Sequence, residues 1–146
     1  MILPVTLVIA AATGLINVWL ALRVGSSRVS GKIMLGDGGE AAMAAKIRAH
    51  GNLTEYAPTV LILMALIELA RGPSLWLWIV GAGFVVVRLA HAFGIARPAP
   101  GPLRMIGALG TWLAIVVLAI WALAIGYQAE WTPPTVRTIP ASQPAA

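Results

Sequence analysis

Polar and charged side chains recur at helical spacing in one otherwise apolar stretch of this chain. On an α-helix four of them fall within a sector of about 60°: Arg48, Asn52, Glu55 and Thr59. Tyr56 lies on the flank of that sector. A guanidinium, an amide and a carboxylate on one helix face are suited to binding the charged ends of a small peptide-like molecule.

A second polar face is formed by Arg88 and His91, which are three residues apart, with Ile95 four residues further on. Arginines also flank the other apolar stretches of the chain, namely Arg23, Arg28 and Arg104. Antiparallel helices would bring all of these groups to the same surface of the bilayer. We therefore expect one polar cluster built from four helices.

Positive charge exceeds negative charge in this cluster, because Glu55 is the single acid that faces the arginines. A charge inside a bilayer costs about 2.5–3.5 kcal/mol on insertion scales, so the cluster needs partners or a ligand. The planar guanidinium grips carboxylates through two hydrogen bonds. The residue types therefore predict a site for a small anion with more than one charged group.

Each side chain also has a structural interpretation, which the sequence alone leaves open. The alternatives are extension to lipid headgroups, ion pairing, hydrogen bonding between helices, and packing. Arg48 and Arg104 could extend to lipid headgroups, and Glu55 could be an ion-pair partner. Asn52 could hydrogen-bond to a neighbouring helix, and His91 and Tyr56 could be packing residues.

Four apolar segments must position these groups, at residues 2–24, 51–70, 75–95 and 103–128. Each has about the 20 residues that a helix needs to cross the bilayer. The chain is 60% hydrophobic and 10% charged, which is too apolar for a soluble domain of 146 residues. We expect an all-α, integral membrane four-helix bundle with up-down-up-down topology, and a homotrimer of such bundles.

Composition excludes several other classes of protein and site. Because the chain has no Cys and only two His, a disulfide framework and a dedicated metal site are not expected. The net charge of +5 does not come with a basic-aromatic face, so we expect no nucleic-acid partner. Residues 1–130 form one membrane domain, and the Pro-, Ser- and Thr-rich residues 131–146 are expected to be a disordered tail.

The short connections carry three further expectations. Residues 71–74, Arg-Gly-Pro-Ser, predict a tight turn between two antiparallel helices. Asp37 and Glu40 are spaced like an N-cap and its partner at the start of a long second helix. Glu68, three residues before Arg71, is interpreted as half of an interfacial charge pair without a function.

Basic residues are unequally divided between the two ends of the bundle. Seven lie at one end and two at the other: Arg23, Arg28, Lys32, Lys46, Arg48, Arg97 and Arg104 against Arg71 and Arg137. By the positive-inside rule the first end faces the cytoplasm and both termini face the exterior. We expect a multi-pass protein of the bacterial inner membrane with its site in the cytoplasmic leaflet.

The string R-A-H-G-N-L-T-E-Y-A-P, from Arg48 to Pro58, resembles the motif of the membrane-associated proteins in eicosanoid and glutathione metabolism, the MAPEG family. Residues 88–94, R-L-A-H-A-F-G, and Arg104 resemble the family's third-helix motif and the arginine that opens its fourth helix. The G-D-G-G-E loop at residues 36–40 resembles a loop of bacterial members. The similarity covers nearly all of the chain except its tail.

The resemblance implies a homotrimer that binds glutathione between subunits, as the co-substrate and without a metal. The residues that would hold glutathione are Arg48, Asn52, Glu55, Tyr56, Arg88 and His91, with Arg23 or Arg28 from the first helix. Arg104 would face the thiol as the catalytic residue. The partners implied are a hydrophobic electrophile or a lipid hydroperoxide that enters from the lipid bilayer.

Two departures argue against a prostaglandin isomerase. Ile95 stands where several eicosanoid-branch members have a tyrosine, and Met105 follows Arg104 where the prostaglandin E synthases have a serine. A broad glutathione transferase or peroxidase is expected instead. Two alternative functions remain, a non-catalytic lipid-binding or scaffold protein and a small multidrug transporter. Such transporters carry an essential carboxylate in their first helix, where this chain has only Asn17.

Overall fold

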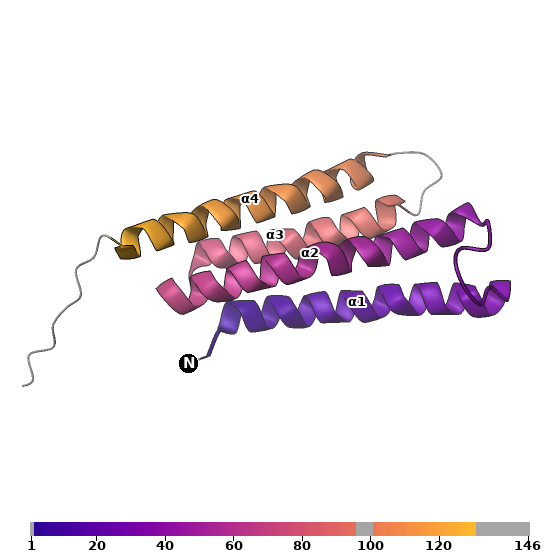
Figure 1. Cartoon of the computed structure of the whole chain (residues 1–146), viewed down its shortest axis with the longest axis horizontal. Coiled ribbons are helices and arrows are strands. Elements are labelled where there is room, and N and C mark those ends of the chain that lie inside the picture. Colours follow the sequence, from indigo (N-terminus) through magenta and orange to yellow (C-terminus); the bar gives the residue numbers. More distant parts are fainter. Residues whose placement is uncertain (1, 96–100, 131–146) are drawn as a thin grey trace, which may run out of the picture.

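Four long helices make up the computed structural model of the chain, which describes residues 2–95 and 101–130 (Figure 1). They are α1 (Pro4–Gly31), α2 (Ala41–Arg71), α3 (Leu75–Ile95) and α4 (Pro102–Glu130). No strand occurs within the described residues. Consecutive helices run in opposite directions, which confirms the all-α, up-down-up-down bundle.

The helices form three layers, with α2 and α3 in the middle layer (Figure 1). The helix α1 packs on one side of this pair and α4 packs on the other. Among the described residues α1 makes no contact with α4. The pair α2 and α3 therefore separates α1 from α4.

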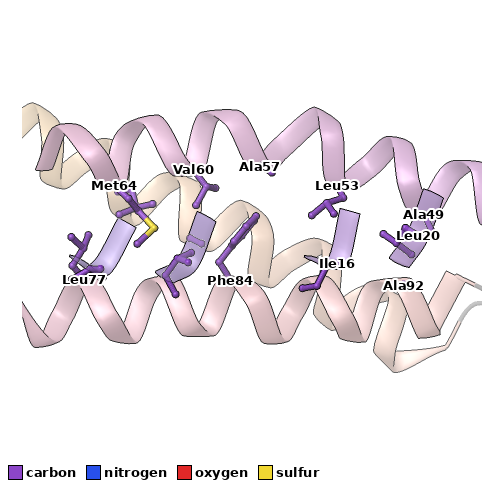
Figure 2. Close-up of a cluster of buried hydrophobic side chains, with 14 of the residues drawn as sticks. Ile16, Leu20, Ala49, Leu53, Ala57, Val60, Met64, Leu77, Phe84 and Ala92 are labelled. Atoms are coloured by element: carbon purple, nitrogen blue, oxygen red, sulfur yellow. The ribbon is translucent and has the colours of Figure 1, made fainter. Parts of the chain in front are cut away.

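A continuous apolar core runs between the layers (Figure 2). Leu53 and Met64 from α2 meet Leu77 and Phe84 from α3, and all four side chains are at most 1% exposed. Gly81 lets the helices approach closely, because a Cβ atom there would lie 2.7 Å from side-chain atoms of Ile9 and Met64. This packing fixes the rotation of each helix about its axis, and hence the direction of its polar face.

Large apolar side chains also cover the outside of the bundle, above all on α1 and α4. Examples are Leu15, Leu22, Leu113 and Leu123, each more than 60% exposed. All four helices are long and apolar enough to cross a membrane. An apolar surface of this extent is stable where lipid is the surrounding solvent, as expected of a membrane bundle.

The connection between α1 and α2 differs from the sequence-based expectation. The predicted cap is wrong, because α2 begins at Ala41 and Glu40 in the N-cap position makes no side-chain hydrogen bond. Asp37 instead stabilises a turn within the loop, because its Oδ1 accepts a hydrogen bond from the Gly39 amide at 3.0 Å. The helix α2 is nevertheless long, as predicted.

The interpretation of Glu68 as an interfacial charge pair is also wrong. Its carboxylate is 1% exposed and accepts hydrogen bonds from the backbone amides of Val5 at 2.9 Å and Thr6 at 2.8 Å. Those amides lie in the first turn of α1, where helical N–H groups lack partners within the helix. Glu68 therefore caps α1 from the last turn of α2, and Arg71 bonds to Gln128 instead.

Gly72, with φ of 78°, permits the tight turn that joins α2 to α3, so the predicted hairpin is confirmed.

Other predictions fall outside the described residues. These are the disordered tail at 131–146 and the positions of Arg97 and Arg137, which entered the count of basic residues.

Candidate functional site

A pocket of about 400 Å³ opens between α2, α3 and α4 at the end of the bundle where α4 begins. Its polar lining residues are Arg48, Asn52, Tyr56, Arg88, His91 and Arg104. The rest of its wall is formed by Gly101, Met105, Ala108 and Trp112. Six of the nine side chains singled out in the sequence thus lie around one cavity, whose volume is in the ~300–1,000 Å³ range of small-molecule sites.

His91 joins the three helices that surround the pocket. Its Nε2 atom lies 3.0 Å from Nδ2 of Asn52 on α2, and its Nδ1 atom lies 3.3 Å from the backbone oxygen of Arg104 on α4. Both ring nitrogens are therefore engaged by protein atoms. These two contacts fix the position of the first turn of α4 relative to α2 and α3.

Two glycines allow α3 and α4 to meet at this level. A Cβ atom on Gly107 would lie 2.6 Å from Cα of His91, and one on Gly94 would lie 2.7 Å from the carbonyl carbon of Leu103. Among the glycines expected to permit close contacts, Gly81, Gly107 and Gly110 face neighbouring helices, whereas Gly83 has nothing within 4 Å.

Arg88 is the most buried cation of the site, with 2% of its surface exposed. Its Nη1 atom donates to the Thr111 hydroxyl at 3.3 Å, and its guanidinium carbon lies 6.0 Å from the centre of the Tyr56 ring. Its Nε atom is buried without a hydrogen-bond partner among the described residues. The guanidinium is held in place by neutral groups and forms no ion pair with an acid of the described residues.

Arg48 and Glu55 form the one ion pair between described residues, at 3.6 Å. Both side chains are half exposed or more, at 65% and 50%, so the pair is weakly held. Glu55 does not line the pocket and instead lies in an adjacent groove, to which Arg48 also contributes. The pocket itself therefore presents three arginines and no carboxylate from the described residues.

The arginines of α1 lie away from the pocket. Arg23 stacks on the Trp19 ring, with its guanidinium carbon 4.9 Å from the ring centre, and Arg28 lines a separate shallow groove with Lys32. In each arginine one buried Nη1 atom has no hydrogen-bond partner among the described residues. Neither side chain therefore joins the predicted cluster, which is wrong for these two residues in this chain.

Two residues of the site were missed by reasoning from the sequence. Trp112 lines the pocket and donates from Nε1 to the Tyr56 hydroxyl at 3.3 Å, and Thr111 holds Arg88. Both lie two turns after Arg104, so helical spacing from that residue would have found them. Their apolar surroundings in the sequence made them resemble ordinary packing residues.

Comparison with known proteins identifies the family. The MAPEG family model matches residues 6–124, which include every residue that lines the pocket. The chain belongs to the MAPEG family. Its membership confirms the resemblance found in the residue 48–58 motif and, with the four apolar helices, establishes an integral membrane protein.

Two curated relatives of this MAPEG protein are both named inner membrane protein YecN. One is from Escherichia coli strain K12 and the other from Escherichia coli O6:H1. Each is 29% identical over 93 residues, covering 64% of this chain and 70% of the relative. These names describe a membrane location and mention no substrate.

Proposed function

We propose that this MAPEG protein is a membrane-bound glutathione S-transferase or peroxidase. The observation that carries the proposal is the pocket that Arg48, Arg88 and Arg104 line, in which no acid of the described residues takes part. Glutathione has two carboxylates and a thiol that can ionise, so it supplies the negative charge that the pocket lacks. Its free amino group would meet Glu55 beside Arg48 at the pocket's edge.

Arg104 is the residue we propose to activate the thiol. It opens α4 from the first turn, where the partial positive charge of the helix N-terminus adds to that of the guanidinium. A free thiol has a pKa of ~8.5, and lowering it to ~7 requires about 2 kcal/mol of preferential thiolate stabilisation. A guanidinium beside the sulfur in a site of low dielectric constant is sufficient for this.

The chemistry then follows from the thiolate. In conjugation, its sulfur forms a bond to an electrophilic carbon, and the leaving group departs with its electron pair. In the peroxidase reaction, the sulfur attacks the terminal oxygen of a lipid hydroperoxide, the O–O bond breaks, and the alkoxide takes up a proton. A second glutathione converts the resulting sulfenic acid to the disulfide and water. Met105, Ala108 and Trp112 give the apolar wall where such a co-substrate would enter from lipid.

A homotrimer with the site between subunits forms part of the proposal. The absence of α1 from the pocket lining in the described residues supports it, because an α1 arginine from another copy could then complete the pocket. Arg23 and Arg28 remain equal candidates for this role. We further propose a bacterial inner membrane location, with the pocket in the cytoplasmic leaflet and both termini outside. Native mass spectrometry in mild detergent tests the assembly, and a stable monomer that binds glutathione would refute it.

Thermal unfolding and turnover of the detergent-solubilised protein test the function directly. We expect glutathione to raise the unfolding temperature, and conjugates with chlorodinitrobenzene to form. Ophthalmic acid, in which a methyl group replaces the thiol, should stabilise the protein without supporting turnover. Stabilisation without turnover by glutathione itself would favour a non-catalytic lipid-binding or scaffold protein. If neither effect is seen the proposal fails, and a small transporter becomes the better hypothesis.

A further inference from the structure

The last turns of α1 are longer than a membrane crossing requires. About 20 helical residues cross a hydrocarbon core of ~30 Å, and α1 has 28. Its first turn lies beside the last turn of α2, since Glu68 binds the Val5 and Thr6 amides, so α1 enters the bilayer where α2 leaves it. We therefore expect residues 28–31 among the lipid headgroups, at the end of the bundle where α4 begins (Figure 1).

The chain folds back at the end of α1 and forms a groove there. The backbone N–H of Ile33 donates to the Arg28 carbonyl at 3.0 Å, and that of Lys32 donates to the Val29 carbonyl at 3.3 Å. Such a pair of bonds is a common way to end a helix. It brings the following residue, Met34, beside the last turn of α1. The groove is lined by Arg28, Val29, Lys32, Ile33 and Met34.

Lys32 adopts a backbone conformation that favours glycine. Its φ is 53°, in the left-handed region, where a Cβ atom brings a steric cost. Its ammonium group makes no ion pair or side-chain hydrogen bond with the described residues. A charged side chain placed at such a cost, with no partner in the described part of the chain, indicates a partner outside it.

Two apolar side chains beside this lysine are almost fully exposed. Met34 is 93% exposed and Leu35 is 89% exposed, and both lie in the connection after α1, outside the membrane-spanning helices. Apolar side chains next to a cation are typical of segments that lie in the membrane surface. There, acyl chains cover the apolar groups and headgroup phosphates attract the cations.

We propose that this groove binds the headgroup of an anionic phospholipid, with Lys32 as the phosphate-binding cation and with Met34 and Leu35 inserted among the acyl chains. Charge complementarity supports this occupant, because no acid of the described residues lines the groove. Arg28 also lines it but is a candidate for the pocket of another copy, so we assign the phosphate to Lys32. The lipid site does not depend on glutathione binding or turnover.

Three substitutions separate the charge of Lys32 from its backbone conformation and from its position. Lys32→Gln removes the charge and keeps a side chain in the left-handed region. Lys32→Gly removes the charge and also the steric cost. Lys46→Gln is the matched control, because Lys46 lies at the same end of the bundle but outside the groove, and its Nζ already donates to the Ser27 hydroxyl.

Native mass spectrometry of the detergent-solubilised protein, titrated with phosphatidylglycerol or phosphatidylcholine, measures the binding. We expect phosphatidylglycerol to bind the unmodified protein about tenfold more tightly. Lys32→Gln and Lys32→Gly should each weaken its binding about fivefold and leave phosphatidylcholine unaffected, whereas Lys46→Gln should change neither by more than about twofold. Lys32→Gly should unfold no earlier than the unmodified protein, which excludes misfolding as the cause of its loss.

Two results of this titration would overturn the lipid site. One is an unmodified protein that does not prefer phosphatidylglycerol. The other is an equal loss in Lys32→Gln and Lys46→Gln, which would make the binding a property of the total charge. Displacement of phosphatidylglycerol by millimolar inorganic phosphate would also overturn it, because the groove would then be a site for soluble phosphate.

The double variant Met34→Ser, Leu35→Ser tests the apolar half of the site. We expect it to weaken phosphatidylglycerol binding about tenfold while the oligomeric state, read from the same spectra, stays unchanged. An unchanged lipid affinity would overturn the insertion of these side chains. If the oligomer dissociated at the same time, this surface would instead be a contact between copies of the chain.

Discussion

Buried charged side chains at the two ends of this bundle differ in how completely their hydrogen bonds are satisfied. At the end where α1 begins, Glu68 is 1% exposed, and two backbone amides at 2.8 and 2.9 Å satisfy its carboxylate. At the other end Arg88 is 2% exposed, yet it bonds to a neutral hydroxyl and keeps a buried Nε atom without a partner among the described residues. Similar burial thus accompanies a complete set of partners at one end and an incomplete set at the other.

This difference is the one that the proposed function requires between a structural charge and a charge that binds a ligand. A satisfied buried acid stabilises the packing of α1 against α2 and has little left to offer a ligand. The charge of buried Arg88 at a pocket of about 400 Å³ is costly, and an anionic ligand would lower that cost. Substitutions at the Glu68 end should therefore change stability, and those at the pocket end should change binding and turnover.

The largest effect is expected from Arg104→Ala. It should reduce kcat about 100-fold while glutathione affinity falls only a few-fold, because the lost interaction favours the ionised, reacting sulfur. Arg104→Lys should recover part of the loss, since a point charge does not reproduce the planar guanidinium. Steady-state conjugation kinetics measure both variants. Arg71→Ala, which removes a cation at the opposite end, is the matched control and should leave kcat unchanged.

Glu68→Ala should produce the largest loss of stability. It leaves the Val5 and Thr6 amides without their acceptor and removes a negative charge from the N-terminus of α1, at a cost of about 2–3 kcal/mol. Denaturation in detergent with and without glutathione measures the change. Exposed Glu40, which makes no capping bond, provides the control as Glu40→Gln. A Glu68→Ala protein as stable as the unmodified one would show that the cap contributes nothing.

A smaller effect is expected from Glu55→Gln. Because Glu55 pairs with Arg48 at the edge of the pocket, its loss should weaken glutathione binding about fivefold. Glu68→Gln should leave this affinity unchanged and lower only the unfolding temperature. Calorimetric titration of both variants makes the comparison. Equal affinities would assign Glu55 a structural role like that of Glu68.

Much of the fold and part of the site follow from local patterns in the sequence. The apolar segments and the Arg-Gly-Pro-Ser turn predict four antiparallel helices. Helical spacing places Asn52 and His91 in one predicted polar cluster, and the structure has their side chains 3.0 Å apart. Glu68 could not be interpreted in this way, because its partners are main-chain amides more than 60 positions earlier. Hydrophobic periodicity carries no information about main-chain partners.

Other features depend on three-dimensional packing that no local pattern encodes. The layered arrangement keeps α1 from α4, and neither Arg23 nor Arg28 lines the pocket. Trp112 belongs to the pocket because α4 leans on α3 through Gly107, and its indole bond to Tyr56 follows from that contact. Among the described residues α1 therefore adds no side chain to the pocket.

The most direct test of a thiolate-binding pocket is the ultraviolet absorbance of glutathione bound to the protein, followed across pH. In the unmodified protein we predict that the thiol titrates near ~7, below the ~8.5 of a free thiol, and that Arg104→Ala returns it toward the free value. Saturating glutathione keeps both forms fully bound during the titration. A bound thiol that titrates at its free value in the unmodified protein, or at the same pH in both forms, would contradict the role of Arg104.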